Sequence, residues 1–111
     1  MWFIFPQLRG LGQSAMAHRY GIASRVEAEA YLAHPILGAR LIECTGLVNA
    51  VEGASIDEIL GDIDGLKFRS SMTLFDAVSP PGSLFEAALA KYYASRKDGV
   101  TLEMLSVDAA S

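Results

Sequence analysis

The sequence has 111 residues, 51% of them hydrophobic, and a formal net charge of −4 from nine basic and thirteen acidic residues. A chain of this length fits one domain with one core, so we expect residues 1–107 to form that domain and residues 108–111 to be a frayed tail. Because Lys and Arg form no cluster that could neutralise phosphates, a nucleic-acid partner is not expected.

The chain opens with the apolar run MWFIF, which Pro6, Gln7 and Arg9 then interrupt. A signal peptide needs about 7–15 apolar residues and a membrane span needs about 20, so the run is too short for either. We therefore predict no membrane segment, and we expect the aromatic start to pack against protein.

Two glycines and an alanine follow with the G-x-G-x-x-A spacing of a dinucleotide-binding turn, at Gly10, Gly12 and Ala15. That turn also needs a second strand ending in an acidic residue about 20 positions later. The available acids, Glu27 and Glu29, fall inside a predicted helix. The glycines are therefore predicted to form an ordinary loop.

Helix starts are marked by a serine followed three residues later by glutamate, the capping-box pattern. It occurs in SRVE (24–27), SIDE (55–58) and SLFE (83–86), each followed by apolar residues at helical spacing. Ser14 is predicted to cap an earlier helix that ends near Ile22. Apart from the first five residues, no run alternates as a strand does. We predict an all-α, compact, multihelical single domain with orthogonal helix packing.

The longest helix is predicted over residues 35–52, with Pro35 at its first position, His34 as its cap and Gly53 at its end. One face carries apolar residues and is predicted to be buried, which makes this the expected central helix: Leu37, Leu41, Cys44, Val48 and Val51. A neighbouring face carries small residues that favour a close helix approach: Gly38, Gly46 and Ala50, with Ile42 among them.

Another helix is predicted from about Gly65 to Val78, ended by SPPG (79–82) because proline cannot continue a helix. Its buried side is predicted to carry Phe68, Met72, Leu74, Phe75, Val78 and Ser79. The helix that follows repeats the pattern with Phe85, Ala88, Leu89 and Tyr92.

Metal and cysteine chemistry have little support. His18, His34 and Cys44 have no metal-ligand spacing, and DEILGDID (57–64) lacks the ligand pattern of a calcium loop, so it is predicted to be a solvated helix junction. Cys44 is the only cysteine, which excludes an internal disulfide and favours a reducing, cytoplasmic location. No metal or cofactor is expected.

One polar cluster stands out, because helical spacing brings Asp64, Lys67, Ser70 and Ser71 toward one face. A carboxylate, an ammonium and hydroxyls could bind an anion or activate a hydroxyl. The alternative is an exposed ion pair between Asp64 and Lys67, which contributes a few tenths of a kcal/mol. Asp64 and Lys67 are the candidate catalytic residues.

Three segments together resemble the bacterial domain-of-unknown-function family 1810: MWFIFPQLRGLGQSAMAHRYGI, EAEAYLAHPILGARLIEC and DGLKFRSSMTLF. The resemblance covers most of the chain and implies a compact all-helical fold of the mycobacterial-hypothetical-protein type. Family members usually carry a further N-terminal helix, so the resemblance implies either a start codon assigned too late or the loss of that helix, under which the aromatic start would pack.

Three functions remain open from the sequence. The first is binding of a small polar or nucleotide-like ligand, with candidate contacts at Trp2, Gln7, Tyr20, Arg40, Ser70 and Ser71. The second is hydrolysis of N-glycosidic bonds in ADP-ribosyl-type compounds, in which Asp64 would stabilise an oxocarbenium-like centre. The third is a non-catalytic protein-interaction module whose partner the sequence does not identify.

Overall fold

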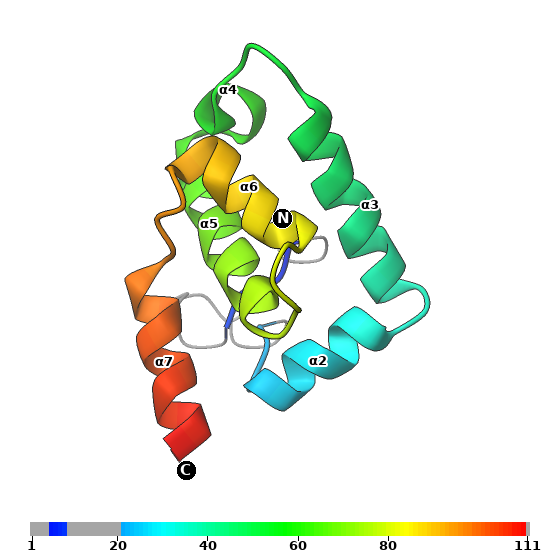
Figure 1. Ribbon diagram of the computed structural model, residues 1–111, viewed down its shortest axis with the longest axis vertical. Helices are drawn as coiled ribbons and strands as arrows, with labels where there is room; N and C mark the ends of the chain where they lie inside the picture. Colours follow the sequence, from blue (N-terminus) through cyan, green and yellow to red (C-terminus); the bar gives the residue numbers. More distant parts are fainter. Residues whose placement is uncertain (1–4, 9–20, 111) are drawn as a thin grey trace.

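Six α-helices make up the regular structure in the computed structural model of the protein, which describes residues 5–8 and 21–110 (Figure 1). They are α2 (Arg25–Ala33), α3 (Leu37–Ala50), α4 (Ile56–Leu60), α5 (Asp62–Ala77), α6 (Leu84–Tyr93) and α7 (Gly99–Ala110). Within those ranges the only β-type pairing is an isolated parallel bridge between Leu8 and Ile22. The prediction of an all-α single domain is confirmed.

Helix α5 is the centre of the fold, and it contacts α2, α4, α6 and α7. In Figure 1 it runs through the middle of the molecule, with α6 crossing it, α3 on the right and α7 at the lower left. Residues 70–76 of α5 are all buried, so this stretch has no solvent-exposed face. The prediction that 35–52 is the central helix is wrong, since α3 leaves Ile42 and Leu47 exposed and packs mainly on α2 and α6.

The start of the chain reaches the core through residues 5–8. The Phe5 ring meets the Phe68 ring edge-on, with the ring centres 4.9 Å apart, and Phe5 and Leu8 are each 5% exposed. The amide of Ile22 donates to the Gln7 carbonyl at 2.8 Å and ties this segment to the residues before α2. Phe5 therefore packs on α5, and the rest of the aromatic start, residues 1–4, lies outside the described residues.

The three predicted serine caps all form. Ser24, Ser55 and Ser83 each accept, at 3.2 Å, from the amide of the glutamate three residues later. Only Ser55 completes the reciprocal box, because Glu58 in turn accepts from the Ser55 amide. Glu86 accepts from Gly82 instead. The predicted helix from Ser14 to about Ile22 lies mostly outside the described residues, and Gly21 and Ile22 are not helical.

Helix α3 begins at Leu37 and ends at Ala50, two residues inside each predicted boundary. The residue before α3 is Ile36 and not the predicted cap His34, although His34 Nδ1 accepts from the amides of Ile36 and Leu37, each at 3.1 Å. The chain turns sharply here, so α3 starts after the turn and Pro35 precedes it.

Only one position of the predicted small-residue face makes a close approach. A Cβ placed on Gly38 would lie 1.9 Å from the Leu32 carbonyl oxygen, whereas a Cβ on Gly46 would meet nothing within 4 Å. The buried side of α3 instead runs through Gly38, Leu41 and Thr45. The predicted close packing along this face is thus confirmed at the α2–α3 turn and wrong farther along the helix.

Side chains of α6 donate hydrogen bonds to backbone carbonyls of the neighbouring helices α3 and α5. Lys91 and Tyr92 donate to carbonyls at the C-terminal end of α3, where a cation is favoured by the helix dipole. Tyr93 donates to the Gly65 carbonyl of α5 at 2.5 Å. Burial raises the pKa of the Tyr93 hydroxyl above its usual value, the carboxylate of Asp57 raises it further, and Arg69 opposes both.

The acidic segment 57–64 is a helix junction, as predicted: α4 ends at Leu60, Gly61 turns the chain with φ +89°, and α5 starts at Asp62. Across the described part of the chain, no three His, Cys, Asp or Glu side chains are grouped as metal ligands. None of the described helices is long and apolar enough to cross a membrane.

We predict that Gly38→Ala destabilises the protein while Gly46→Ala does not. The methyl group at residue 38 must displace backbone, so the free energy of unfolding should fall by about 2–4 kcal/mol. At residue 46 the methyl group meets open space, and the better helix propensity of alanine should add about 0.5–1 kcal/mol. Urea unfolding of both variants measures this, and equal effects would contradict the close approach at Gly38.

We also predict that Tyr93→Phe flattens the loss of stability at alkaline pH. Because the folded state raises the pKa of Tyr93, its contribution is complete below the unfolded value of 10.0 and is lost as pH rises above it. The wild type should therefore lose stability more steeply above about pH 10 than the variant, by at most about 1.4 kcal/mol per pH unit. Urea unfolding across this range tests the prediction, and parallel curves would refute it.

Candidate functional site

Three predicted site residues meet in one depression between α5 and the start of α7. Lys67 and Ser70 lie one turn apart on α5, and Gln7 joins them from the N-terminal segment. This depression, here called the lysine pocket, has a volume of about 280 Å³. Its remaining lining residues are Ile63, Leu66, Asp98 and Val100.

The other predicted site residues lie elsewhere. Asp64 lines a separate depression with residues 60–63, and the alternative ion pair with Lys67 does not form. Ser71 is fully buried in the core, where its hydroxyl finds no partner among the described residues. Arg40 is exposed on α3, near Tyr31. Burial raises the pKa of the Tyr31 hydroxyl, and the positive charge of Arg40 partly opposes this shift. Trp2 and Tyr20 lie outside the described residues.

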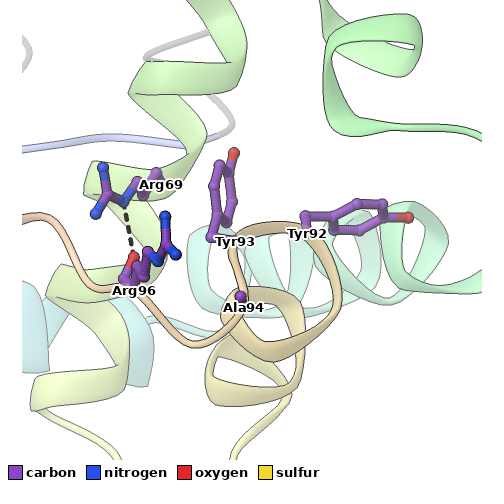
Figure 2. Close-up of a pocket in the computed structure, with 5 residues that line it drawn as sticks. All are labelled: Arg69, Tyr92, Tyr93, Ala94 and Arg96. Atoms are coloured by element: carbon purple, nitrogen blue, oxygen red, sulfur yellow. Dashed lines mark hydrogen bonds between the residues drawn. The ribbon is translucent and has the colours of Figure 1, made fainter.

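A larger depression, which the sequence did not predict, lies where α6 ends beside α5. It has a volume of about 460 Å³ and is lined by Arg69, Tyr92, Tyr93, Ala94 and Arg96, and it is here called the arginine pocket. Figure 2 shows the Arg96 side chain rising toward Arg69 and the Tyr93 ring, while the Tyr92 ring points away from both arginines. Tyr93 thus forms an aromatic wall beside the Arg96 side chain.

Arg69 is held in a fixed orientation by the backbone that connects α6 to α7. Its Nε donates to the Arg96 carbonyl at 2.7 Å (Figure 2), and its Nη2 donates to the Lys97 carbonyl at 2.9 Å. A guanidinium carries five N–H donors, so the remaining ones are free to meet a ligand without reorganising the side chain. The guanidinium is positioned before any ligand arrives.

The positive charge of the arginine pocket is not neutralised by a described carboxylate. Arg69 and Arg96 form no ion pair within residues 5–8 and 21–110. The neighbouring Lys97 is different, because its ammonium lies 3.2 Å from the buried carboxylate of Asp76. The two arginines therefore give a locally basic site on a chain whose net charge is −4.

The turn at the rim of this pocket adopts an unusual backbone conformation. Ala94 and Ser95 have φ of +52° and +63°, the left-handed region that residues with a side chain disfavour by about 1–2 kcal/mol each. The Ser95 amide donates to the Leu89 carbonyl at 2.9 Å and closes the end of α6. This sharp turn carries Arg96 back over α5 and beside Arg69.

Sequence reasoning missed the arginine pocket because its parts are distant along the chain. The segment YYASRK (92–97) does carry a local signal, since two aromatic residues are followed by two cations. Arg69 is 27 positions before Arg96, and no spacing rule connects the two. Only the packing of α6 on α5 brings them together.

The comparisons with known proteins agree on the kind of protein this is. Residues 1–105 match the family described as "Protein of unknown function (DUF1810)". The crystal structure of the conserved hypothetical protein Rv1873 from Mycobacterium tuberculosis is 57% identical, with a TM-score of 0.92, over 95% of this chain and 75% of that one. None of the curated proteins matches. The chain belongs to the DUF1810 family of proteins of unknown function.

Proposed function

We propose that the protein binds a small ligand carrying a phosphate or similar dianionic group in the arginine pocket. The observation that carries the proposal is the meeting of Arg69 and Arg96, neither paired with a described carboxylate, in one depression of about 460 Å³. Pockets for small molecules commonly measure about 300–1,000 Å³, so the volume suits a ligand larger than inorganic phosphate.

The chemistry of the two arginines favours a tetrahedral anion. Guanidinium groups bind phosphate oxygens through paired, charge-assisted hydrogen bonds, which are stronger than neutral ones. Arg69 is already oriented by the two carbonyls of the α6–α7 connection, which lowers the entropy lost on binding. Arg96 is exposed and can close on the anion from the other side.

The aromatic wall supports a ligand with a planar portion. The Tyr93 hydroxyl is committed to the Gly65 carbonyl, so the ring is fixed in place. A fixed aromatic face beside two cations suits a phosphate joined to a ring or base. A long polynucleotide remains disfavoured, because its many phosphates need a longer basic stripe than two arginines provide.

The proposal is tested by calorimetric titration with inorganic phosphate, adenosine 5′-monophosphate and adenosine. The monophosphate should bind best and adenosine worst, and added salt should weaken the binding. Arg96→Gln should weaken monophosphate binding at least about tenfold, since hydrogen bonds to charged groups contribute about 1.5–3 kcal/mol. Within residues 5–8 and 21–110 the exposed Arg96 side chain makes no hydrogen bond or ion pair, so this variant should stay folded.

The matched control is Ala39→Glu, an exposed position on α3 that changes the net charge by the same amount. It should leave the affinity for the monophosphate within about twofold, because surface charges beyond a Debye length are screened. Equal weakening by Arg96→Gln and Ala39→Glu, or equal binding of adenosine and the monophosphate, would overturn the proposal.

Hydrolysis of N-glycosidic bonds stays a prediction, and the geometry gives it less support. Its two candidate residues, Asp64 and Lys67, line different depressions. A role as a protein-interaction module also stays a prediction. The phosphate-type ligand is favoured because its binding groups share one pocket.

A further inference from the structure

The lysine pocket presents two opposite charges that do not pair with each other. Lys67 has no hydrogen-bond or ion-pair partner in the described part of the chain, and Asp98 lines the same depression of about 280 Å³. Both charged groups are therefore available to a ligand in this depression.

Asp98 is held in place by the helix that it starts. Its Oδ2 accepts from the Thr101 amide at 3.0 Å and from the Thr101 hydroxyl at 2.5 Å, the bonding of a helix cap. Its own amide donates to the Thr73 hydroxyl of α5 at 2.9 Å. Oδ2 of the carboxylate is therefore committed to the cap of α7, whereas its Oδ1 has no described partner.

Apolar side chains flank these two charges. Ile63, Leu66 and Val100 line the pocket and are 71%, 66% and 53% exposed. Ser70 and Gln7 add neutral polar groups on the α5 side. Exposed aliphatic side chains often mark a binding surface. Here they flank an ammonium and a carboxylate, so the pocket suits a ligand that carries a negative charge, a positive charge and an aliphatic group.

We propose that the lysine pocket is a second ligand site, for a free α-amino acid with a small aliphatic side chain. The ligand's carboxylate meets the Lys67 ammonium, and its ammonium meets Oδ1 of Asp98. The aliphatic side chain packs on Ile63, Leu66 and Val100. The depression, of about 280 Å³, leaves room for a small amino acid such as leucine.

The second site is separate from the arginine pocket. Ser70 follows Arg69 directly on α5, yet the two residues line different depressions. The connection between α6 and α7 has Arg96 in one pocket and Asp98 in the other. This proposal therefore does not depend on the proposed phosphate ligand, and each can fail without the other.

The test is an NMR titration of the ¹⁵N-labelled protein with leucine and with two analogues that each lack one charge. These are 4-methylpentanoate, which has no ammonium, and 3-methylbutylamine, which has no carboxylate. Leucine should bind at least about tenfold more tightly than either analogue, because each loses one charge-assisted contact. The amides that shift should belong to residues 66–70 and 98–101.

Two substitutions of opposite charge provide the control. Lys67→Met and Asp98→Asn change the net charge in opposite directions, and asparagine keeps the helix cap. Both should weaken leucine binding at least about tenfold. Lys67→Met should also abolish binding of 4-methylpentanoate, whereas Asp98→Asn should leave it unchanged. Adenosine 5′-monophosphate titrated into the same variants should give the wild-type affinity, which separates this site from the arginine pocket.

Three results would overturn the assignment. One is binding of 4-methylpentanoate as tight as that of leucine, which would make the site a plain anion site. Another is unchanged leucine affinity in either variant while circular dichroism shows both folded. The last is the absence of saturable shifts for leucine in the wild-type protein.

Discussion

The complete burial of the middle of α5 is the constraint on which the rest of the structure depends. A helix with no exposed face over residues 70–76 must be covered from several directions, and α2, α6 and α7 pack against α5, with α4 beside its start at Gly65. The N-terminal segment adds Phe5 on Phe68. Because the buried backbone is already hydrogen-bonded within the helix, polar side chains of α5 can bond to the surrounding elements, and Arg69, Thr73 and Asp76 do this.

The same three side chains hold the α6–α7 connection, which contributes residues to both pockets. Arg69 binds the carbonyls of the α6–α7 connection, Thr73 binds the Asp98 amide, and Asp76 pairs with Lys97. The connection is thus fixed along the surface of α5 by polar bonds, with little apolar packing of its own. The two pockets lie beside this connection, which contributes Arg96 to one of them and Asp98 to the other.

The sequence predicted what depends on neighbouring residues and missed what depends on distant ones. The serine caps and the end of α5 before the prolines follow from local backbone chemistry, and the structure has them at the positions predicted from the sequence. The central helix is the one that other elements cover on every side. The spacing of apolar residues in α3 indicates one buried face, but it does not show how many elements pack around the helix. The lysine pocket was half predicted, since Lys67 and Ser70 share a helix, whereas Asp98 arrives from another element.

The polar attachment of the α6–α7 connection has a consequence for how the molecule opens. A segment held by a few side-chain bonds can detach at a lower cost than one held by an apolar face, so the α6–α7 connection is expected to open before α7, whose Leu105 is buried in the core. This opening removes Arg96 from one pocket and Asp98 from the other in a single event. A ligand bound in either pocket raises the free energy needed for this opening, because it binds only the closed state. Two ligands that do not touch each other would therefore bind cooperatively, since each increases the population of the state that the other binds.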